Sequence, residues 1–206
     1  MSIEKLLVAN RGEIAIRIIR AARELGVDSV AIHSQDDANS LHVRLADEAV
    51  SLDGAGARAY LDVESVVRAA IGAGCDALHP GYGFLAESAE LSRRCDEMGI
   101  TFVGPTPESL ELFGDKARAR ALAVELDVPV LPGTETAVEL EGATEFFHSL
   151  GNGGAMMLKA IAGGGGRGMR VVTAEDQIAE AYERCQSEAA TAFGNGDLLV
   201  ERLMTT

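Results

Sequence analysis

The sequence predicts an α/β protein in which a parallel sheet covered by helices is followed by a smaller α+β unit. In the first half, short apolar runs alternate with helical patterns. Strands joined through helices pair in parallel, because a parallel connection needs a crossover of about a dozen residues or more. In the second half, two apolar runs flank a glycine-rich loop with no helix between them. These two patterns together predict the fold class.

The first half opens with an apolar strand at 6–10, followed by a helix at 12–25 that Gly26 ends. Five apolar residues of this helix fall on one predicted face: Ile14, Ile18, Ala21, Ala22 and Leu25. The next expected elements are strands at 29–33 and 49–52, a helix at 63–71, a strand at 77–79, a helix at 87–98 and a strand at 100–103. This alternation predicts a parallel sheet with helices on both faces.

The second half begins with a helix expected at 115–126. The segment 128–133, VPVLPG, then breaks the helical pattern with two prolines and a glycine, which predicts a domain joint. Beyond it we expect a helix at 140–150, strands at 155–160 and 169–172, a helix at 174–190 and a strand at 198–201. These elements predict a small α+β unit.

The bulk composition excludes several classes of partner. The chain has 32 Asp and Glu against 18 Lys and Arg, and its net charge of −14 would repel a nucleic-acid backbone. No apolar run reaches the ~20 residues that span a bilayer, and the first residues do not form a signal peptide. We therefore expect a cytoplasmic protein with neither nucleic acid nor a membrane as partner. Cys75, Cys95 and Cys185 are widely spaced, which predicts reduced packing residues.

The glycine loop is the sharpest feature of the sequence. Five of the six residues 163–168 are glycines, which let a backbone approach a ligand closely and offer N–H groups to phosphate oxygens. A flexible linker is the plain alternative, but linkers are not normally flanked by two apolar runs of matched length. A Walker loop or a dinucleotide fingerprint would join a strand to a helix, and the GxxxxGK[ST] spacing is absent. The pattern predicts a hairpin that covers phosphates.

Two lysines and one glutamate accompany this loop. Lys159 ends the strand that enters the loop, and Lys116 begins an upstream helix, so both ammonium groups could neutralise nucleotide phosphates. Each lysine alone is typical of a solvated surface. The strand LLVERL at 198–203 resembles a hinge on which an adenine ring hydrogen bonds, with Glu201 accepting from the exocyclic amine.

Five segments together resemble the biotin carboxylase component of biotin-dependent carboxylases. They are LLVANRGEIAIRIIRA, LHPGYGFLAES, TFVGPTPESLELFGDKARAR, MLKAIAGGGGRGMRVV and LLVERL. The resemblance spans the whole chain, with the segments in the family's order and spacing. It implies a Rossmann-like N-terminal domain at 1–113, a helical linker at 114–131 and the lid of an ATP-grasp fold at 132–206.

The resemblance also implies binding residues. The implied ATP contacts are Lys116, Lys159, Gly163, Gly164, Gly165, Gly166, Arg167, Gly168, Glu201, Arg202, Leu203 and Met204. Tyr82 and Gly83 match a loop that lies near biotin, although Pro80, Gly81 and Gly83 would form a turn in any protein. Arg17, Arg20 and Glu24 share one helix face and match a homodimer contact, whereas the plain alternative is a solvated charged face.

The activity implied by the resemblance is the ATP-dependent carboxylation of biotin with bicarbonate, with Mg²⁺ or Mn²⁺. Biotin would be presented on a carrier domain, and a carboxyltransferase component would be a further partner. In the family, the catalytic and metal-binding residues follow the motif that matches Glu201. We therefore expect an N-terminal fragment that is inactive alone. The alternatives are another bicarbonate-activating ATP-grasp ligase, such as the carbamoyl phosphate synthetase large chain, or a non-catalytic nucleotide-binding or dimerising module.

Overall fold

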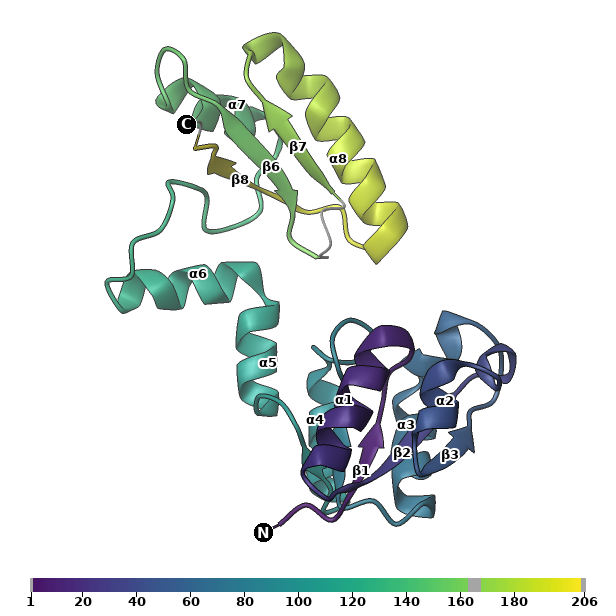
Figure 1. Ribbon diagram of the computed structural model, residues 1–206. Helices are drawn as coiled ribbons and strands as arrows, with labels where there is room; N and C mark the ends of the chain where they lie inside the picture. The colour runs from purple at the N-terminus through teal and green to yellow at the C-terminus, as the bar shows by residue number, and fades with distance from the viewer. Residues whose placement is uncertain (1, 163–167, 205–206) are drawn as a thin grey trace. The chain divides into compact units, whose positions relative to one another are not determined.

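The computed structural model describes residues 2–162 and 168–204 (Figure 1). The chain forms two compact units, Met1–Glu111 and Leu112–Thr206. Within the described residues, no helix is both long and apolar enough to cross a membrane.

The first unit is built on a five-stranded parallel sheet, as the sequence predicted. Its strands are β1 (Lys5–Val8), β2 (Asp28–His33), β3 (Glu48–Ser51), β4 (Ala77–His79) and β5 (Thr101–Phe102). They lie in the order β3-β2-β1-β4-β5. Along the chain, β2 pairs with one edge of β1 and β3 pairs with the far edge of β2, and β4 then pairs with the opposite edge of β1. The direction of winding therefore reverses between β1 and β4.

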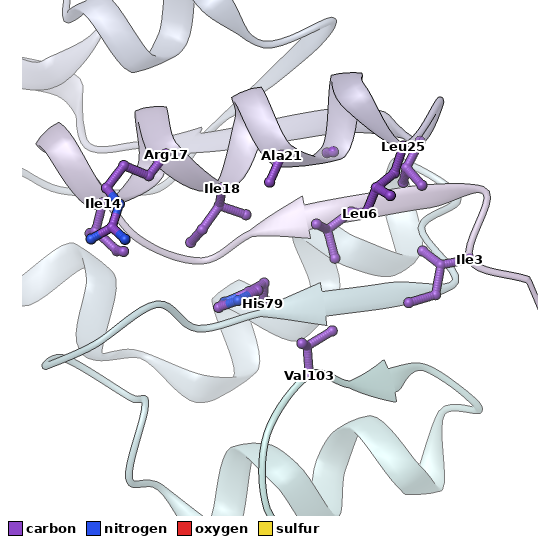
Figure 2. A pocket seen from close by; sticks show the side chains of 11 residues that line it. Ile3, Leu6, Ile14, Arg17, Ile18, Ala21, Leu25, His79 and Val103 are labelled. Carbon is purple, nitrogen blue, oxygen red and sulfur yellow. The ribbon is translucent and has the colours of Figure 1, made fainter.

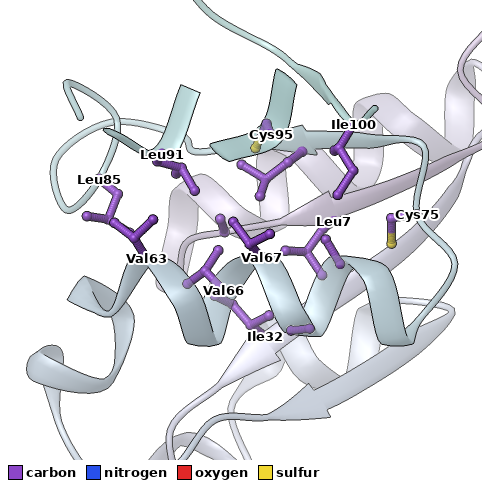
Figure 3. Packing of buried hydrophobic residues seen from close by; sticks show 14 of the residues in the cluster. Leu7, Ile32, Val63, Val66, Val67, Cys75, Leu85, Leu91, Cys95 and Ile100 are labelled. Carbon is purple, nitrogen blue, oxygen red and sulfur yellow. The ribbon is translucent and has the colours of Figure 1, made fainter. Parts of the chain in front are cut away.

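Helices cover both faces of this sheet. They are α1 (Gly12–Glu24), α2 (Leu41–Leu45), α3 (Val63–Gly72) and α4 (Ala89–Glu97), followed by α5 (Pro107–Gly114), with 3-10 turns at Gln35–Asp37 and Ala57–Leu61. Side chains alternate along β1, so Leu6 and Val8 pack under α1 while Leu7 packs on the opposite face. Figure 3 shows Leu7 with Val66 and Val67 of α3 in that second core.

Three predictions for this unit need correction. The prediction missed α2, which has five residues and is too short to show a helical period, and α5, which begins at Pro107, a residue suited to the first turn of a helix. The predicted apolar face of α1 is also only partly correct. The helix buries Ala15, Ile18, Ile19 and Ala22, whereas Ala21 and Leu25 are exposed.

The second unit contains an antiparallel sheet in the order β7-β6-β8. Its elements are α6 (Lys116–Glu125), α7 (Leu140–Ser149), β6 (Met156–Ala160), β7 (Met169–Val172), a 3-10 turn (Glu175–Gln177), α8 (Ile178–Phe193) and β8 (Leu198–Arg202). The antiparallel pairing of β6 with β7 confirms the predicted hairpin. The predicted helix at 174–190 lies three to four residues too early at both ends, because a 3-10 turn precedes α8 and left-handed Gly194 ends it.

One face of the small sheet forms the core of the second unit. Leu158 and Val200 pack on it against Ala143 of α7 and against Tyr182 and Cys185 of α8. The intervening residues, among them Lys159 and Glu201, therefore lie on the opposite face of the sheet. All three cysteines are buried free thiols, as predicted.

Candidate functional site

The carboxyl ends of β1 and β4 form the first candidate site. Open α/β sheets bind ligands at the point where the winding direction reverses, in the crevice beyond the strand ends. Here the segment ANRGE follows β1 and the segment HPGYGF begins at the end of β4. A cavity of about 280 Å³ between them is lined by Asn10, Arg11, Glu13, Ile14, Tyr82, Gly83 and Phe84. The structure thus joins the predicted Tyr82 and Gly83 with residues about 70 positions earlier.

Asn10 connects the two segments. Its side chain is 2% exposed, and its Nδ2 donates to the carbonyl oxygens of Pro80 at 2.7 Å and Tyr82 at 2.9 Å. Its Oδ1 accepts from the N–H of Arg11 at 2.9 Å. A Cβ atom at Gly81, where φ is +70°, would lie only 2.6 Å from Asn10 Nδ2. Both the backbone conformation and the lack of space therefore require glycine there.

Arg11 is fixed on one wall of this cavity by a buried carboxylate. Its Nε and Nη2 each lie 2.7 Å from an oxygen of Asp37. Tyr60 donates a further hydrogen bond to Asp37 at 2.8 Å, and the Arg11 guanidinium lies 5.8 Å from the centre of the Tyr60 ring. Burial alone would raise the pKa of Asp37, but the hydrogen bonds from Tyr60 and Arg11 hold that pKa below its ordinary value. A charged Asp37 thereby holds the guanidinium in place.

Both predicted biotin-loop residues are exposed, Tyr82 at 58%. Its hydroxyl donates to the carboxylate of Glu13, which also lines the cavity. This hydrogen bond raises the pKa of Tyr82, because it stabilises the protonated phenol. The Glu13 carboxylate therefore fixes the Tyr82 hydroxyl at the cavity.

The open face of the small sheet forms the second candidate site. In the strand register Lys159 lies opposite Leu199, so Glu201 is its diagonal neighbour on the same face. The Nζ of Lys159 forms an ion pair with Oε2 of Glu201. Arg120 of α6 lies 4.0 Å from the other carboxylate oxygen and donates to the carbonyl of Leu131. The predicted adenine acceptor thus lies between two cations.

The proline- and glycine-containing segment before α7 lies along β8. The N–H of Thr134 donates to Val200 at 2.9 Å, and the N–H of Arg202 donates to Pro132 at 2.8 Å. A Cβ atom at Gly133 would lie 2.8 Å from the carbonyl oxygen of Val200, so a larger residue does not fit. This segment therefore fixes the strand that carries Glu201.

The remaining predicted nucleotide residues lie at the ends of β6, β7 and β8. Lys116, the first residue of α6, donates to the carbonyl of Ile161 at 3.0 Å, directly after β6. Gly163, Gly164, Gly165, Gly166 and Arg167 lie outside the described residues. Gly168 has a φ of +67°, and its carbonyl accepts from Ala160 at 2.8 Å. Leu203 donates to Ala155 at 2.8 Å, and Met204 is exposed.

The predicted dimer residues Arg17, Arg20 and Glu24 are all exposed on α1. Arg17 lines a cavity of about 600 Å³ whose other residues, apart from His79, are apolar. Figure 2 shows Ile18 of α1 and Leu25, directly after α1, on one side of it and His79 and Val103 on the other. Among residues 2–162 and 168–204, no three His, Cys, Asp or Glu side chains come together in a way that could hold a metal ion.

Sequence reasoning missed Asn10, Arg11 and Arg120 as site residues. The position of ANRGE directly after β1 was the available signal for Asn10 and Arg11, because polar residues at that point of an α/β sheet face the ligand crevice. Arg120 gave no comparable signal, since its partners are set by how α6 and β8 pack.

Comparisons with known proteins agree over the whole chain. The biotin carboxylase N-terminal domain family matches residues 2–110, and the carbamoyl-phosphate synthase L chain ATP binding domain family matches residues 115–206. Pyruvate carboxylase of Bacillus subtilis is 50% identical over 206 residues, which cover 98% of this chain and 18% of that protein. Biotin carboxylase of a Nostoc species is 44% identical over 206 residues, which cover 99% of this chain and 46% of that protein.

A solved structure gives the same result. The biotin carboxylase domain dimer of Hydrogenobacter thermophilus 2-oxoglutarate carboxylase, crystallised with MgADP, ADP and bicarbonate, is similar with a TM-score of 0.90 at 43% identity. The match covers 99% of this chain and 45% of that chain. The chain thus spans less than half the length of each of these relatives. Its N-terminal family match, covering more than half of its residues, shows that this chain belongs to the biotin carboxylase family.

Proposed function

We propose that the protein carrying this chain catalyses the ATP-dependent carboxylation of biotin with bicarbonate. The observation that carries this proposal is the pairing of Lys159 with Glu201 on the open face of the small sheet, beside the hairpin predicted to cover phosphates. A cation and a carboxylate on one face of a sheet offer separate partners for the two ends of a nucleotide. The solved relative from Hydrogenobacter thermophilus contains MgADP and bicarbonate, which supports the same ligands here.

The adenine ring would lie at Glu201 and the chain after it. The Glu201 carboxylate can only accept hydrogen bonds, which suits the exocyclic amine of adenine. The N–H groups of Arg202 and Leu203 already donate to Pro132 and Ala155. We therefore assign one carbonyl oxygen at 202–203 to the second hydrogen of the exocyclic amine, and Met204 to the ring. Met157 and Leu199 share the Glu201 face in the strand register and offer apolar contact.

The phosphates would lie at the other end of β6. Lys159 would release Glu201 and bind phosphate oxygens as a point charge. Lys116, at the point where the chain leaves β6, would provide a second cation, and residues 163–168 would cover the phosphates. In this proposal residues 132–206 are a nucleotide lid, residues 1–113 the N-terminal domain and residues 114–131 a helical linker.

Biotin would lie at the crevice beyond β1 and β4, near Tyr82 and Gly83. A ureido ring needs hydrogen-bond partners and one flat apolar surface, and the cavity offers both in the exposed phenol of Tyr82 and the backbone of Gly83. The carboxylated biotin would be carried to a carboxyltransferase component on a carrier domain. We further propose a homodimer through the α1 face with Arg17, Arg20 and Glu24, because the solved relative forms a domain dimer. The cytoplasmic location stays a prediction.

The metal required for phosphoryl transfer does not fit the described residues, which bring no three acidic or histidine ligands together. We therefore assign no metal-dependent step to them. The relatives are more than twice as long as this chain, and we propose that their additional length supplies the metal ligands and the catalytic base. The expected result is that residues 1–206 alone release no phosphate from ATP in response to bicarbonate. Bicarbonate-dependent release that Lys159→Met abolishes would contradict this expectation.

The proposal is tested on the protein as its gene encodes it. Phosphate release from MgATP is measured with and without bicarbonate, and then with and without free biotin. Biotin carboxylation predicts turnover that requires bicarbonate and rises with biotin. Turnover that is independent of biotin would overturn the proposal.

A second candidate is a carbamoyl phosphate synthetase activity, because the second family match is to the ATP binding domain of that enzyme's large chain. It also begins with bicarbonate, but its second substrate would be ammonia rather than biotin. Replacing biotin by ammonium in the same assay separates the two. For residues 1–206 alone, a non-catalytic nucleotide-binding or dimerising module is the remaining alternative, and nucleotide titration with and without biotin tests it.

A further inference from the structure

We propose that Asn10 is a positioning residue for the carboxylation of biotin. Its side-chain amide would set the conformation of residues 80–84 and thereby the positions of Tyr82 and Gly83. This inference rests on the proposed function, because it concerns the loop that we assign to biotin.

The hydrogen bonds of Asn10 match the bonding capacity of its amide group. The two hydrogens of Nδ2 are donated to two carbonyls of one loop, those of Pro80 and Tyr82. The oxygen accepts from the backbone of the other segment, at Arg11. An aspartate in this place would present a second oxygen to the two carbonyls, and an alanine would leave them without these donors. The Asn10 amide thereby joins the ends of β1 and β4.

The loop needs such support because one of its residues has an unusual backbone conformation. Gly81 and Gly83 have positive φ values of 70° and 65°, which glycine adopts readily, but Phe84 has a φ of 43°, which is uncommon for a residue with a side chain. Conformations of this kind persist where the surrounding structure holds them in place. Phe84 is held by stacking on Tyr60, with ring centres 5.3 Å apart. Asn10 holds the other end of the loop, and Tyr82 lies between these two anchors.

The contacts of Asn10 favour a role in positioning the loop over a general contribution to the stability of the fold. It lines the same cavity as Tyr82 and Gly83, and both of its donated bonds end on that loop. Its loss should therefore displace the biotin loop and leave the nucleotide residues of the second unit unchanged. A displacement of about 1 Å in a substrate-positioning group can lower activity by up to about 100-fold.

The test uses Asn10→Ala and Asn10→Asp in the protein as its gene encodes it. Bicarbonate-dependent phosphate release is measured over a range of free biotin and, separately, over a range of MgATP. We expect kcat/KM for biotin to fall by about 10- to 100-fold, while KM for ATP stays within about twofold. Asn39→Asp is the matched control, because Asn39 is exposed and the substitution makes the same change in charge.

The outcomes are distinguishable. If the unsubstituted protein shows no biotin-dependent turnover, both the proposed function and this inference fail. If it is active and the Asn10 variants keep its kcat/KM for biotin, only the inference fails. A parallel rise in both KM values with a lower Tm would show a general structural role and would also overturn it.

Gly81→Ala provides an independent variant in case Asn10→Ala does not fold. The added methyl group would lie 2.6 Å from Asn10 Nδ2 and so disturbs the same contact from the loop side. We expect the same selective loss of kcat/KM for biotin. An unchanged kcat/KM for biotin in a folded Gly81→Ala protein would refute the inference.

Discussion

Replacing Lys159 by methionine tests the nucleotide assignment most directly. Methionine keeps an unbranched apolar side chain on the sheet face but removes the charge. Lys159 is paired with Glu201, and both side chains are partly exposed, at 28% and 22%. Ion pairs with this much solvent contact contribute little to folding, about 1 kcal/mol or less. The variant should therefore fold, with Arg120 remaining near Glu201.

The effect on nucleotide binding should be larger. Hydrogen bonds to charged groups contribute about 1.5–3 kcal/mol, and a loss of about 2 kcal/mol corresponds to a roughly 30-fold rise in Kd. Because Lys159 is assigned to the phosphates, this rise should appear for ADP and ATP but not for adenosine. Loss of the lysine even frees the Glu201 carboxylate for the adenine amine.

The assay is isothermal titration with ATP, ADP and adenosine, with urea unfolding as the check on folding. Lys5→Met is the matched control. Lys5 is also ion-paired, with Glu48 at 2.8 Å, and is 22% exposed, but it lies in the first unit. Unchanged ATP affinity in Lys159→Met would refute the phosphate assignment. An equal loss for adenosine and ATP would show that Lys159 acts only through Glu201.

Two further predictions concern stability. Gly133→Ala should lower the free energy of unfolding by about 1–3 kcal/mol, because its Cβ would lie 2.8 Å from the Val200 oxygen and 2.9 Å from Glu201 Cγ. Gly72→Ala, whose Cβ meets nothing within 4 Å, should cost nothing in the same urea titration, and equal losses would contradict the steric argument. Burial lowers the pKa of His42, so as the pH falls the unfolded chain takes up this proton at a higher pH than the folded chain does. The free energy of unfolding should therefore decrease as the pH drops below about 6.5 towards the folded-state pKa. An NMR titration that places the His42 pKa at or above its ordinary value would refute this prediction.

Much of the fold could be predicted because its signals are local. The β6–β7 hairpin follows from two apolar runs around the glycine loop, and the parallel sheet follows from alternating strands and helices. The errors in the predicted fold also have local causes. Five residues of α2 are too few to show a period. Leu25 extends the apolar spacing of α1 beyond the part of the helix that touches the sheet, so it is 80% exposed.

The candidate sites could be predicted less completely, because they depend on register and packing. Lys159 and Glu201 were both selected from the sequence, but their pairing across 42 residues depends on how β6 aligns with β8. Asn10 was not selected, since its partners are carbonyls 70 and 72 residues away that become neighbours only when β4 pairs with β1. Every residue has a backbone carbonyl, so a side chain that bonds to carbonyls does not require any particular residue type as its partner. A sequence pattern therefore cannot reveal the pair.

The strand order of the small sheet has a consequence for folding during synthesis. The parallel sheet of the first unit has all its strands once Phe102 has left the ribosome. In the small sheet, the central strand β6 can pair with β7 as soon as β7 has been synthesised. Its second partner, β8, begins about 40 residues after the end of β6 and is therefore synthesised much later. Until then one edge of β6 is open to pairing with other chains. Slowing translation between residues 172 and 202 should therefore increase aggregation of the nascent chain, and a chaperone that binds apolar strands should act in this interval.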